Sequence, residues 1–161
     1  ASRYLPEAEA AAGGEESLPS GVVEVRENGL GTFSNDVRTD RHLLPADEPP
    51  AVGGDDSGPT PYDYLLASLG ACTSMTLRMY ARHKGLPVEG LSVRVSHRRV
   101  HAKDCMECEY SEGQIDVIDR QIAIKGDLTR QQRERMLEIS GRCPVCRTLT
   151  GQLEISSKLE E

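Results

Sequence analysis

The chain has 161 residues and a formal net charge of −7, with 37% hydrophobic and 28% charged residues. This length fits one domain that buries about 70% of the surface of its unfolded chain, and the composition is that of a soluble globular protein. The acidic balance and the absence of Trp argue against a nucleic-acid partner, because phosphate binding needs clustered Lys and Arg. The short basic pair Arg98-Arg99 is interpreted as a solvated face. No stretch approaches the ~20 apolar residues of a membrane span, so no membrane partner is expected.

The N-terminus and the cysteine count indicate the compartment. No apolar signal core begins the chain, which predicts a cytoplasmic location where the five cysteines stay largely reduced. An odd number of cysteines also disfavours a framework of structural disulfides. The chain begins at Ala1 without Met, as an excised or processed domain would. We expect residues 1–20, rich in Ala, Glu, Gly and Ser, to be a linker or the tail of an upstream region, and residues 21–161 to be the folded domain.

A hairpin and a long loop follow the tail. Two short extended runs flank Asn28-Gly29 within residues 22–37, which predicts a β-hairpin. Prolines and glycines exclude regular structure after about Leu44, so residues 45–60 are predicted to be a loop. Loops of this length are more often functional or part of an interface than idle.

The clearest predicted helix runs from Pro61 for roughly 36 Å. Thr60 suits the N-cap, Pro61 the first helical position, and Asp63 completes a capping-box-like pattern. Gly85 is the predicted C-terminal stop. One stripe at helical spacing is predicted to be the apolar face: Leu65, Leu69, Cys72, Thr76 and Met79.

The second half of the chain alternates between strands and short helices. Alternating apolar and polar residues predict two paired strands, residues 91–103 and 113–127. Thr129 is predicted to cap a short amphipathic helix that ends near Gly141. A last strand is predicted over residues 152–159. Strands, a long helix, strands, short helices and a strand indicate an α+β fold with a largely antiparallel sheet.

Cys72 lies in the middle of the predicted long helix, on its apolar stripe. Gly70 and Ala71 precede it and allow another backbone or helix to approach closely. Position alone fits a small buried core residue, since free Cys is among the most buried residue types. A thiolate in the middle of a helix gains little from the helix dipole, so a reactive Cys72 would need a cation from elsewhere.

The other four cysteines form two C-x-x-C pairs. Cys143 precedes Pro144, a predicted helix start, so that exposed backbone N–H groups would stabilise a Cys143 thiolate; a plain N-cap thiol is the alternative. One helical turn separates Cys143 from Cys146, so a disulfide between them would be local and would constrain little else. Acidic neighbours disfavour a thiolate at Cys105 and Cys108.

The two pairs together also suggest a zinc site of four thiolates, with His101 as a further possible ligand. The interval between the pairs exceeds the roughly 15–20 residues usual in zinc ribbons. A zinc site would also leave Cys72 without a role. The cysteines alone therefore leave a redox pair, a metal site and buried thiols as open alternatives.

The segments GPTPYDYLLASLGACTSMTL and CPVCRTL resemble the OsmC/Ohr family of thiol peroxidases. The shared pattern is a Pro-led helix with a cysteine in its middle, and a second cysteine before Pro near the C-terminus, over roughly residues 21–161. DEP…GG…GPTP before the helix resembles a subgroup with members fused behind an α/β-hydrolase domain. The resemblance implies an OsmC-like fold, in which a mostly antiparallel sheet wraps a long central helix. It also implies an intertwined homodimer with active sites at the subunit interface.

The resemblance further implies a thiol mechanism that needs no cofactor. Cys72 would be the peroxidatic cysteine, which attacks an organic hydroperoxide to give a sulfenic acid and an alcohol. Cys143 would resolve the sulfenic acid to a disulfide, and a thiol or dithiol reductant would restore the enzyme. An arginine from a loop would face Cys72, and Arg41 or Arg38 are the nearest upstream candidates. The apolar stripe would favour organic hydroperoxides over hydrogen peroxide.

Asp63 stands beside Tyr62, the position at which the family's peroxidases carry a Glu ten residues before the peroxidatic cysteine. On a continuous helix Asp63 lies ~13.5 Å from Cys72, so it cannot touch the thiol of its own helix directly. It is either the acidic partner of the site or only a helix cap. The altered position motivates a second reading, a non-catalytic OsmC-like dimer that binds a small ligand or zinc. Three residues of the long loop are further candidates to line the site: His42, Asp47 and Glu48.

Overall fold

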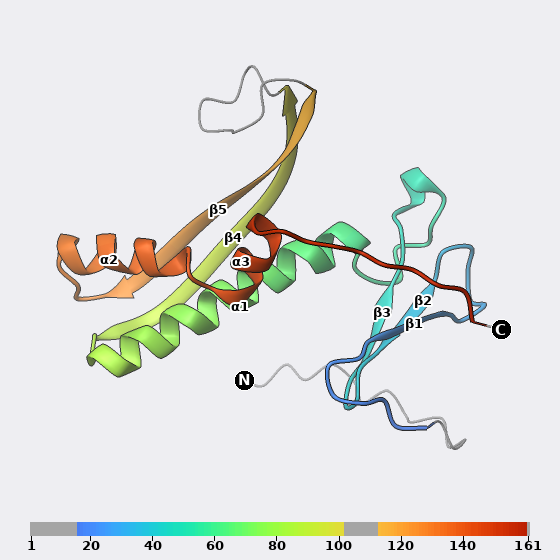
Figure 1. The fold of residues 1–161 in the computed structure, drawn as a ribbon, viewed down its shortest axis with the longest axis horizontal. Helices are drawn as coiled ribbons and strands as arrows, with labels where there is room; N and C mark the ends of the chain where they lie inside the picture. Colours follow the sequence, from blue (N-terminus) through green and yellow to red (C-terminus); the bar gives the residue numbers. More distant parts are fainter. Residues whose placement is uncertain (1–15, 102–112, 161) are drawn as a thin grey trace. The chain divides into compact units, whose positions relative to one another are not determined.

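A computed structural model of the chain describes residues 16–101 and 113–160, which form a mixed α+β fold (Figure 1). The chain divides into two compact units, an N-terminal unit that ends at Tyr64 and a C-terminal unit that begins at Leu65. Each described unit has an antiparallel sheet of its own, one with three strands and one with two. The predicted α+β class and the antiparallel pairing are confirmed.

The N-terminal unit is built on three short strands. They pair in the order β1-β2-β3, with both pairs antiparallel. The predicted hairpin is confirmed, because β1 pairs with β2 across a turn in which Gly29 has a φ of 73°. Asn28 fixes this turn by accepting a hydrogen bond from the Leu30 N–H at 3.0 Å and donating one to Asp36 at 3.1 Å. The strands are β1 (Glu24–Glu27), β2 (Asn35–Arg38) and β3 (Leu43–Ala46).

The third strand is not predicted from the sequence, because it contains Pro45. Proline has no N–H to give to a ladder, but an edge strand can carry it. β3 lies at the edge of the sheet and Pro45 is opposite Asp36. The rest of the predicted loop is irregular apart from the 3₁₀ turn η1 (Pro50–Val52).

The predicted long helix is confirmed as α1 (Pro61–Lys84), with 24 residues. At its start the Thr60 N–H donates to the Asp63 carboxylate at 3.0 Å, and the Asp63 N–H donates to the Thr60 hydroxyl at 3.2 Å. These reciprocal bonds form the predicted capping box. After the last turn Gly85 takes a left-handed conformation with φ 64°, which ends the helix.

The buried face of α1 agrees with the predicted stripe at Leu69 and departs from it further along the helix. Met79 is 65% exposed and Cys72 is only half-buried. The helix has a second apolar face on roughly the opposite side, so the sequence pattern alone does not say which face meets the core. The residues that α1 buries within the chain are Leu69, Thr73, Leu77 and Ala81. The exposed second face consists of Ala67, Ala71, Met75 and Met79.

The C-terminal unit combines a long hairpin with helices. The predicted strand pair is confirmed as β4 (Val88–His101) and β5 (Gln114–Gly126), which are antiparallel with Val95 opposite Arg120. Thr129 caps α2 (Arg130–Ser140) with a capping box, and Cys143 caps α3 (Pro144–Thr150), as predicted.

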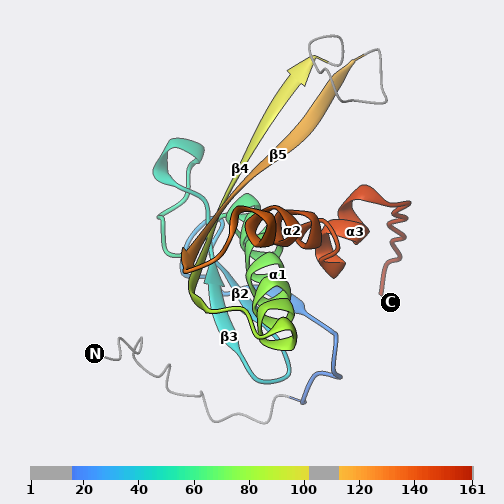
Figure 2. The same cartoon turned by 90° about the vertical axis from the view of Figure 1, so that its left-hand side faces the viewer.

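The core of this unit lies where α1 and α2 pack against the hairpin end that carries Val88 and Gly126. The opposite end, at His101 and Gln114, extends beyond the helices (Figures 1 and 2). Gly70 of α1 lies close to β4, since a Cβ there would be 3.3 Å from the Val95 side chain. The close approach predicted at Gly70 is thus made by a strand of the same chain. The buried core residues are Leu77, Ala81, Val88, Leu128, Met136 and Ile139.

Two other predictions, the last strand and the solvated basic pair, have opposite outcomes. The last predicted strand is wrong, because residues 152–160 form no strand, and Ile155 and Leu159 are 84% and 95% exposed. Alternating apolar and polar residues form a strand only where the segment pairs with a sheet edge and packs its apolar side against a core. Residues 152–160 do neither in the single chain. Arg98 and Arg99 form exposed ion pairs with Asp119 and Asp116, which confirms the solvated basic face.

Candidate thiol site

Two cysteines far apart in the sequence meet in the C-terminal unit. Cys72 comes from the middle of α1 and Cys143 from the residue that caps α3. The Cys72 thiol is a near enough neighbour of Cys143 to help lower the pKa of that residue. Both are free thiols, with Cys72 half-buried and Cys143 fully buried at 0% exposure. The contact is of the kind that a reversible disulfide requires.

Local structure holds Cys143 in place. Its backbone is extended, with φ −63° and ψ 139°, and Pro144 occupies the first turn of α3. This geometry turns the side chain back over the helix, where the sulfur accepts a hydrogen bond from the Cys146 N–H at 3.4 Å. The predicted cap is therefore present, and the donor is the backbone of the second cysteine of the C-x-x-C motif.

Arg120 supplies a positive charge from the middle of β5. Its guanidinium donates to the Thr73 hydroxyl at 2.9 Å and to the Ser140 carbonyl at 3.1 Å. The same nitrogen lies 3.9 Å from the Cys143 sulfur. Arg120 thus joins three segments around one thiol: α1, the end of α2 and the cap of α3.

Thr73 completes the surroundings of Cys143. Its hydroxyl donates to the Leu69 carbonyl at 2.7 Å and lies 3.8 Å from the Cys143 sulfur, where either group can be the donor. A hydroxyl carries one hydrogen, so a neutral Cys143 can donate to Thr73, whereas an ionised Cys143 can receive the Thr73 hydrogen. The site accommodates either protonation state without breaking its packing.

These contacts set the acidity of Cys143. Burial favours the neutral thiol and by itself raises the pKa. The Cys146 N–H, the Thr73 hydroxyl, the Cys72 thiol and the Arg120 charge act in the opposite direction, and together they hold the pKa of Cys143 below its ordinary value. A lower pKa means that more of Cys143 is thiolate, the form that attacks sulfur and peroxide.

A cavity of about 230 Å³ adjoins the site. It lies among α1, β5 and α3, and Arg120 and Cys146 line it together with Asp116. Most of its remaining wall is apolar, from Leu69, Ile118 and Leu149. The site therefore combines a thiol pair with a small, partly apolar space beside it.

Asp63 and Arg41, the other predicted site residues, lie in the N-terminal unit. Asp63 caps α1, as one of its two predicted roles required. The Arg41 side chain is 83% exposed in the turn between β2 and β3 and lies 3.8 Å from Asp40. A role for Asp63 or Arg41 at the thiols stays a prediction.

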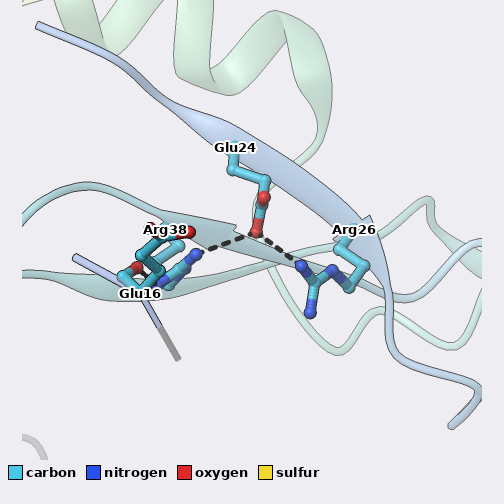
Figure 3. A network of polar contacts seen from close by, with 4 residues as sticks. All are labelled: Glu16, Glu24, Arg26 and Arg38. Atoms are coloured by element: carbon cyan, nitrogen blue, oxygen red, sulfur yellow. Dashed lines mark hydrogen bonds and ion pairs between the residues drawn. The ribbon is translucent and has the colours of Figure 1, made fainter. Parts of the chain in front are cut away.

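Arg38, the other upstream arginine considered, belongs to an ion-pair network on the three-stranded sheet (Figure 3). It lies 3.2 Å from the Glu24 carboxylate, which also binds Arg26 at 3.1 Å, and it donates to the Glu16 carbonyl at 3.1 Å. These contacts give Arg38 a structural role on the sheet.

Asp47 of the long loop is also engaged within the N-terminal unit. Its carboxylate is 2% exposed and accepts hydrogen bonds from the backbone of Glu48, Asp55 and Ser57 and from the Ser57 hydroxyl. The hydrogen bond from the Ser57 hydroxyl is the main cause of a lowered pKa at Asp47. A side chain at Gly54 would collide with the Glu48 carbonyl, so the glycine permits this fold of the loop. For His42 and Glu48 a role in lining the thiol site stays a prediction.

The sequence reasoning missed Arg120, Thr73 and Ser140. A signal for Arg120 is present in the pattern of β5. The residues at 118, 120, 122 and 124 are the less exposed ones of the alternation, and three of them are isoleucines. An arginine on the apolar side of a strand needs a buried partner, and this marks it as a candidate site residue.

The described residues were compared with the requirements of a metal site and of a membrane-spanning helix. Among the described residues, no group of three or more His, Cys, Asp and Glu side chains is placed to hold a metal ion. Cys105 and Cys108, half of the zinc hypothesis, lie outside the described residues. No helix in the described ranges, 16–101 and 113–160, is long and apolar enough to cross a membrane.

Solved structures share this fold at low sequence identity. An OsmC-like protein from Mycoplasma pneumoniae is 22% identical with a TM-score of 0.63, covering 81% of this chain and 86% of that one. An organic hydroperoxide resistance protein OsmC from Legionella pneumophila is 16% identical with a TM-score of 0.59, covering 86% and 95%. The organic hydroperoxide resistance protein OhrB of Bacillus subtilis is 19% identical with a TM-score of 0.53, covering 83% and 92%.

Sequence comparison adds the family. A search among curated proteins finds no significant match. The family model for OsmC-like proteins matches residues 54–158, well over half of the chain and the whole thiol site. The chain belongs to the OsmC-like protein family.

Proposed function

We propose that the protein is a thiol-dependent peroxidase that reduces organic hydroperoxides, with Cys72 as the peroxidatic and Cys143 as the resolving cysteine. The observation that carries the proposal is the contact between these two thiols beside the Arg120 guanidinium. The names of structural neighbours, organic hydroperoxide resistance proteins, support the same class of substrate.

The reaction balances with the two thiols alone. The Cys72 thiolate attacks the outer oxygen of the hydroperoxide, the O–O bond breaks, and the alkoxide takes a proton and leaves as the alcohol. The Cys143 thiolate then attacks the sulfur of the Cys72 sulfenic acid, an S–S bond forms, and the hydroxide takes a proton and leaves as water. A thiol or dithiol reductant supplies two electrons and two protons to restore both cysteines.

Arg120 has two functions in this scheme. Its charge favours the Cys143 thiolate, and its bonds to Thr73 and Ser140 hold α1 and the end of α2 together beside Cys143. A charge at about 4 Å, largely shielded from water, stabilises an anion more strongly than at the surface. Arg120 therefore places a cation at Cys143, the partner of Cys72 in the proposed pair.

The cavity supports the choice of substrate. About 230 Å³ bounded by Leu69, Ile118 and Leu149 suits the hydrocarbon part of an organic hydroperoxide, whereas hydrogen peroxide would gain nothing from apolar walls. The expected result is a higher kcat/KM for cumene hydroperoxide than for hydrogen peroxide. Replacing Leu149 with Asn should narrow that ratio. An unchanged ratio would exclude this cavity as the substrate site.

We also infer a homodimer, as in the expectation for the family. The support is the second apolar face of α1, where Met75 and Met79 are 64% and 65% exposed. A helix with apolar residues on opposite sides is usually covered on both. Met79→Glu should weaken self-association by at least about tenfold, measured by sedimentation equilibrium, because it places a charge in the interface. Lys84→Glu, at the exposed end of the same helix, is the control; equal association of both variants would reject this interface.

The direct test of the peroxidase is consumption of cumene hydroperoxide by the full chain with a dithiol reductant. Cys72→Ser should reduce turnover by roughly three orders of magnitude or more, since it removes the nucleophile. Thr76→Ser, one turn further along α1, is the matched control and should retain activity. Consumption that survives in Cys72→Ser would overturn the assignment.

A second candidate is a non-catalytic OsmC-like dimer that binds a small ligand or zinc. The observation that favours it is the engagement of Asp63 as a helix cap beside Tyr62, where the family's peroxidases carry a Glu. Elemental analysis of the purified protein separates the two. One zinc per chain without peroxide consumption would support the second candidate, and consumption by metal-free protein would reject it.

Three expectations accompany the proposal. Reduced cysteines fit a cytoplasmic location, to be checked by cell fractionation. We retain the boundary near residue 20 between a tail and the folded domain; limited proteolysis that cuts first in residues 1–20 tests it. A preceding α/β-hydrolase domain is inferred only from the resemblance, and the length of the natural protein tests it.

A further inference from the structure

The proposed peroxidase uses two cysteines, and Cys146 has no role in it. Cys146 is half-buried and lines the cavity beside Arg120. Its backbone N–H lies 3.4 Å from the Cys143 sulfur. Cys143 therefore has the Cys72 thiol as a neighbour and is joined by a hydrogen bond to the backbone of Cys146, one helical turn further along the chain.

The accessibility of these sulfurs raises a difficulty for the two-cysteine cycle. A reductant must bring its thiolate to one sulfur of the Cys72–Cys143 disulfide, in line with the S–S bond. Cys143 is 0% exposed, so it offers no approach. Cys72 is half-buried and adjoins Ala71, part of the face that the proposed dimer would cover. Cys146 is half-buried and lines the cavity, which gives a reductant a route to its sulfur.

We propose that Cys146 is a third redox thiol, which takes over the disulfide from Cys72 and presents it at the cavity to a dithiol reductant. The inference rests on the proposed peroxidase function for its oxidant. In this proposal the C-x-x-C motif of α3 carries the last disulfide of the cycle, the one that the reductant reduces. That disulfide forms within one helical turn, so nothing else in the fold has to move.

The exchange conserves atoms and electrons. Cys146 loses its proton and its thiolate attacks the Cys143 sulfur of the Cys72–Cys143 disulfide. A Cys143–Cys146 bond forms, the bond to Cys72 breaks, and Cys72 leaves as thiolate and takes up a proton. The peroxidatic thiol is then free for another hydroperoxide before any reductant has arrived.

The last step follows from the surroundings of Cys143. A dithiol reductant attacks the Cys146 sulfur from the cavity and expels Cys143. Thiols that are better stabilised as thiolates leave faster. The Arg120 guanidinium and the Thr73 hydroxyl at the Cys143 sulfur assist that departure. A second thiol of the reductant resolves the mixed disulfide with Cys146 and releases the protein fully reduced.

The exchange is tested without peroxide in a full-length Cys105→Ser, Cys108→Ser protein, which retains the three thiols at issue. One equivalent of diamide oxidises one pair of thiols whatever the peroxidase activity. After equilibration, acid quenching and alkylation, peptide mapping should find Cys143–Cys146 linked and Cys72 alkylated in most chains. A lasting Cys72–Cys143 disulfide with Cys146 alkylated would overturn the proposal.

A hydroperoxide arm separates failure of the relay from failure of the peroxidase. With one equivalent of cumene hydroperoxide, Cys72–Cys143 should appear first and Cys143–Cys146 later. Cys146→Ser should stop at the first disulfide and recycle with dithiothreitol at least about tenfold more slowly, because an intramolecular exchange is lost. Thr148→Ser, on the exposed side of the same helix and outside the cavity wall, should recycle normally. Equal recycling by Cys146→Ser and its parent would overturn the relay alone, whereas no hydroperoxide consumption in any variant would overturn the peroxidase.

Discussion

The Asp47 loop and the Cys143 cap both stabilise a negative charge on a buried side chain with hydrogen-bond donors. In one case the result is a structural contact and in the other a reactive group. Both side chains are almost fully buried, and both have a pKa below the ordinary value. Asp47 is surrounded by donors from residues 48–57, all in its own loop. Cys143 receives its stabilisation from α1, β5 and α3.

The difference lies in what the anion can do. Four short bonds, from 2.7 to 3.2 Å, one to Oδ1 and three to Oδ2, hold the Asp47 carboxylate and fix the loop. The contacts to the Cys143 sulfur are longer, from 3.4 to 3.9 Å, and one neighbour is another thiol. A carboxylate held by four donors of its own loop is structural, whereas a sulfur with a lowered pKa and a neighbouring thiol can react.

The largest expected effect comes from removing the reactive anion. Cys143→Ser should leave the Cys72 sulfenic acid without its partner, so turnover with a dithiol should fall by roughly two orders of magnitude or more. Trapping with dimedone should label Cys72 in the variant after one equivalent of hydroperoxide. Ser34→Ala, a buried residue in the N-terminal unit, should leave both readings unchanged. Normal turnover in Cys143→Ser would remove Cys143 from the mechanism.

Removing the charge beside Cys143 should have the next largest effect. Arg120→Met should raise the pKa of Cys143 toward its ordinary value, because the positive charge of Arg120 is one of the influences that lower it. At neutral pH the rate of disulfide formation should fall with the fraction of Cys143 that is thiolate. The thiolate absorbance, titrated as a difference against Cys143→Ser, gives the pKa.

A conservative variant separates charge from packing. Arg120→Lys should restore most of the pKa shift, since the positive charge remains, even where its melting temperature stays low. Arg98→Met removes an exposed ion pair with Asp119 and should change neither the titration nor the rate. If Arg120→Lys titrates like Arg120→Met, the effect is one of packing and the electrostatic account fails.

At Asp47 the expected effect is on stability. Asp47→Asn replaces two acceptor oxygens by one and a donor, so the melting temperature at neutral pH should fall by several degrees while the Cys143 titration is unchanged. The folded-state pKa is below the ordinary value of 3.8, so the folded form binds fewer protons than the unfolded form near that pH. The stabilisation is therefore present above about pH 4 and is lost as the pH falls through the folded-state pKa. The two melting curves should converge in acid; a constant difference down to pH 2 would contradict this role.

The smallest effect is expected from a single donor of the loop. Ser57→Ala removes the 2.7 Å hydrogen bond to Asp47, the strongest influence on its carboxyl group. The pKa of Asp47 should rise toward its ordinary value, as followed by NMR titration, with a smaller loss of melting temperature than in Asp47→Asn. Ser17→Ala, on an exposed segment, is the control. An unchanged Asp47 titration would mean that the backbone N–H donors, and not the Ser57 hydroxyl, lower the pKa of Asp47.

The sequence predicted the elements whose causes are local. Thr60 and Asp63 cap α1 and Thr129 caps α2 within a few residues of each helix, so their signals are readable in order along the chain. Cys72 and Cys143 were found as a pair through the resemblance to the family. The edge strand with Pro45 was missed, because its pairing depends on a neighbouring strand.

The rest of the site depends on contacts between distant segments. Arg120 and Thr73 are 47 positions apart, and neither carries a motif that names the other. The buried face of α1 was displaced by one residue because two apolar faces compete for the core. The alternating segment at residues 152–159 lacks the sheet edge that would make it a strand. In each case the deciding partner comes from another element.

The proposed peroxidase depends on Cys72 and Cys143 acting as one redox pair. The full-length Cys146→Ser protein isolates this pair, because no exchange can move the disulfide onward. One equivalent of cumene hydroperoxide, followed by acid quenching, alkylation and peptide mass spectrometry, should yield the Cys72 and Cys143 peptides joined by a disulfide in most chains. Recovery of both peptides alkylated and unlinked, with the hydroperoxide consumed at other residues or not at all, would contradict the account.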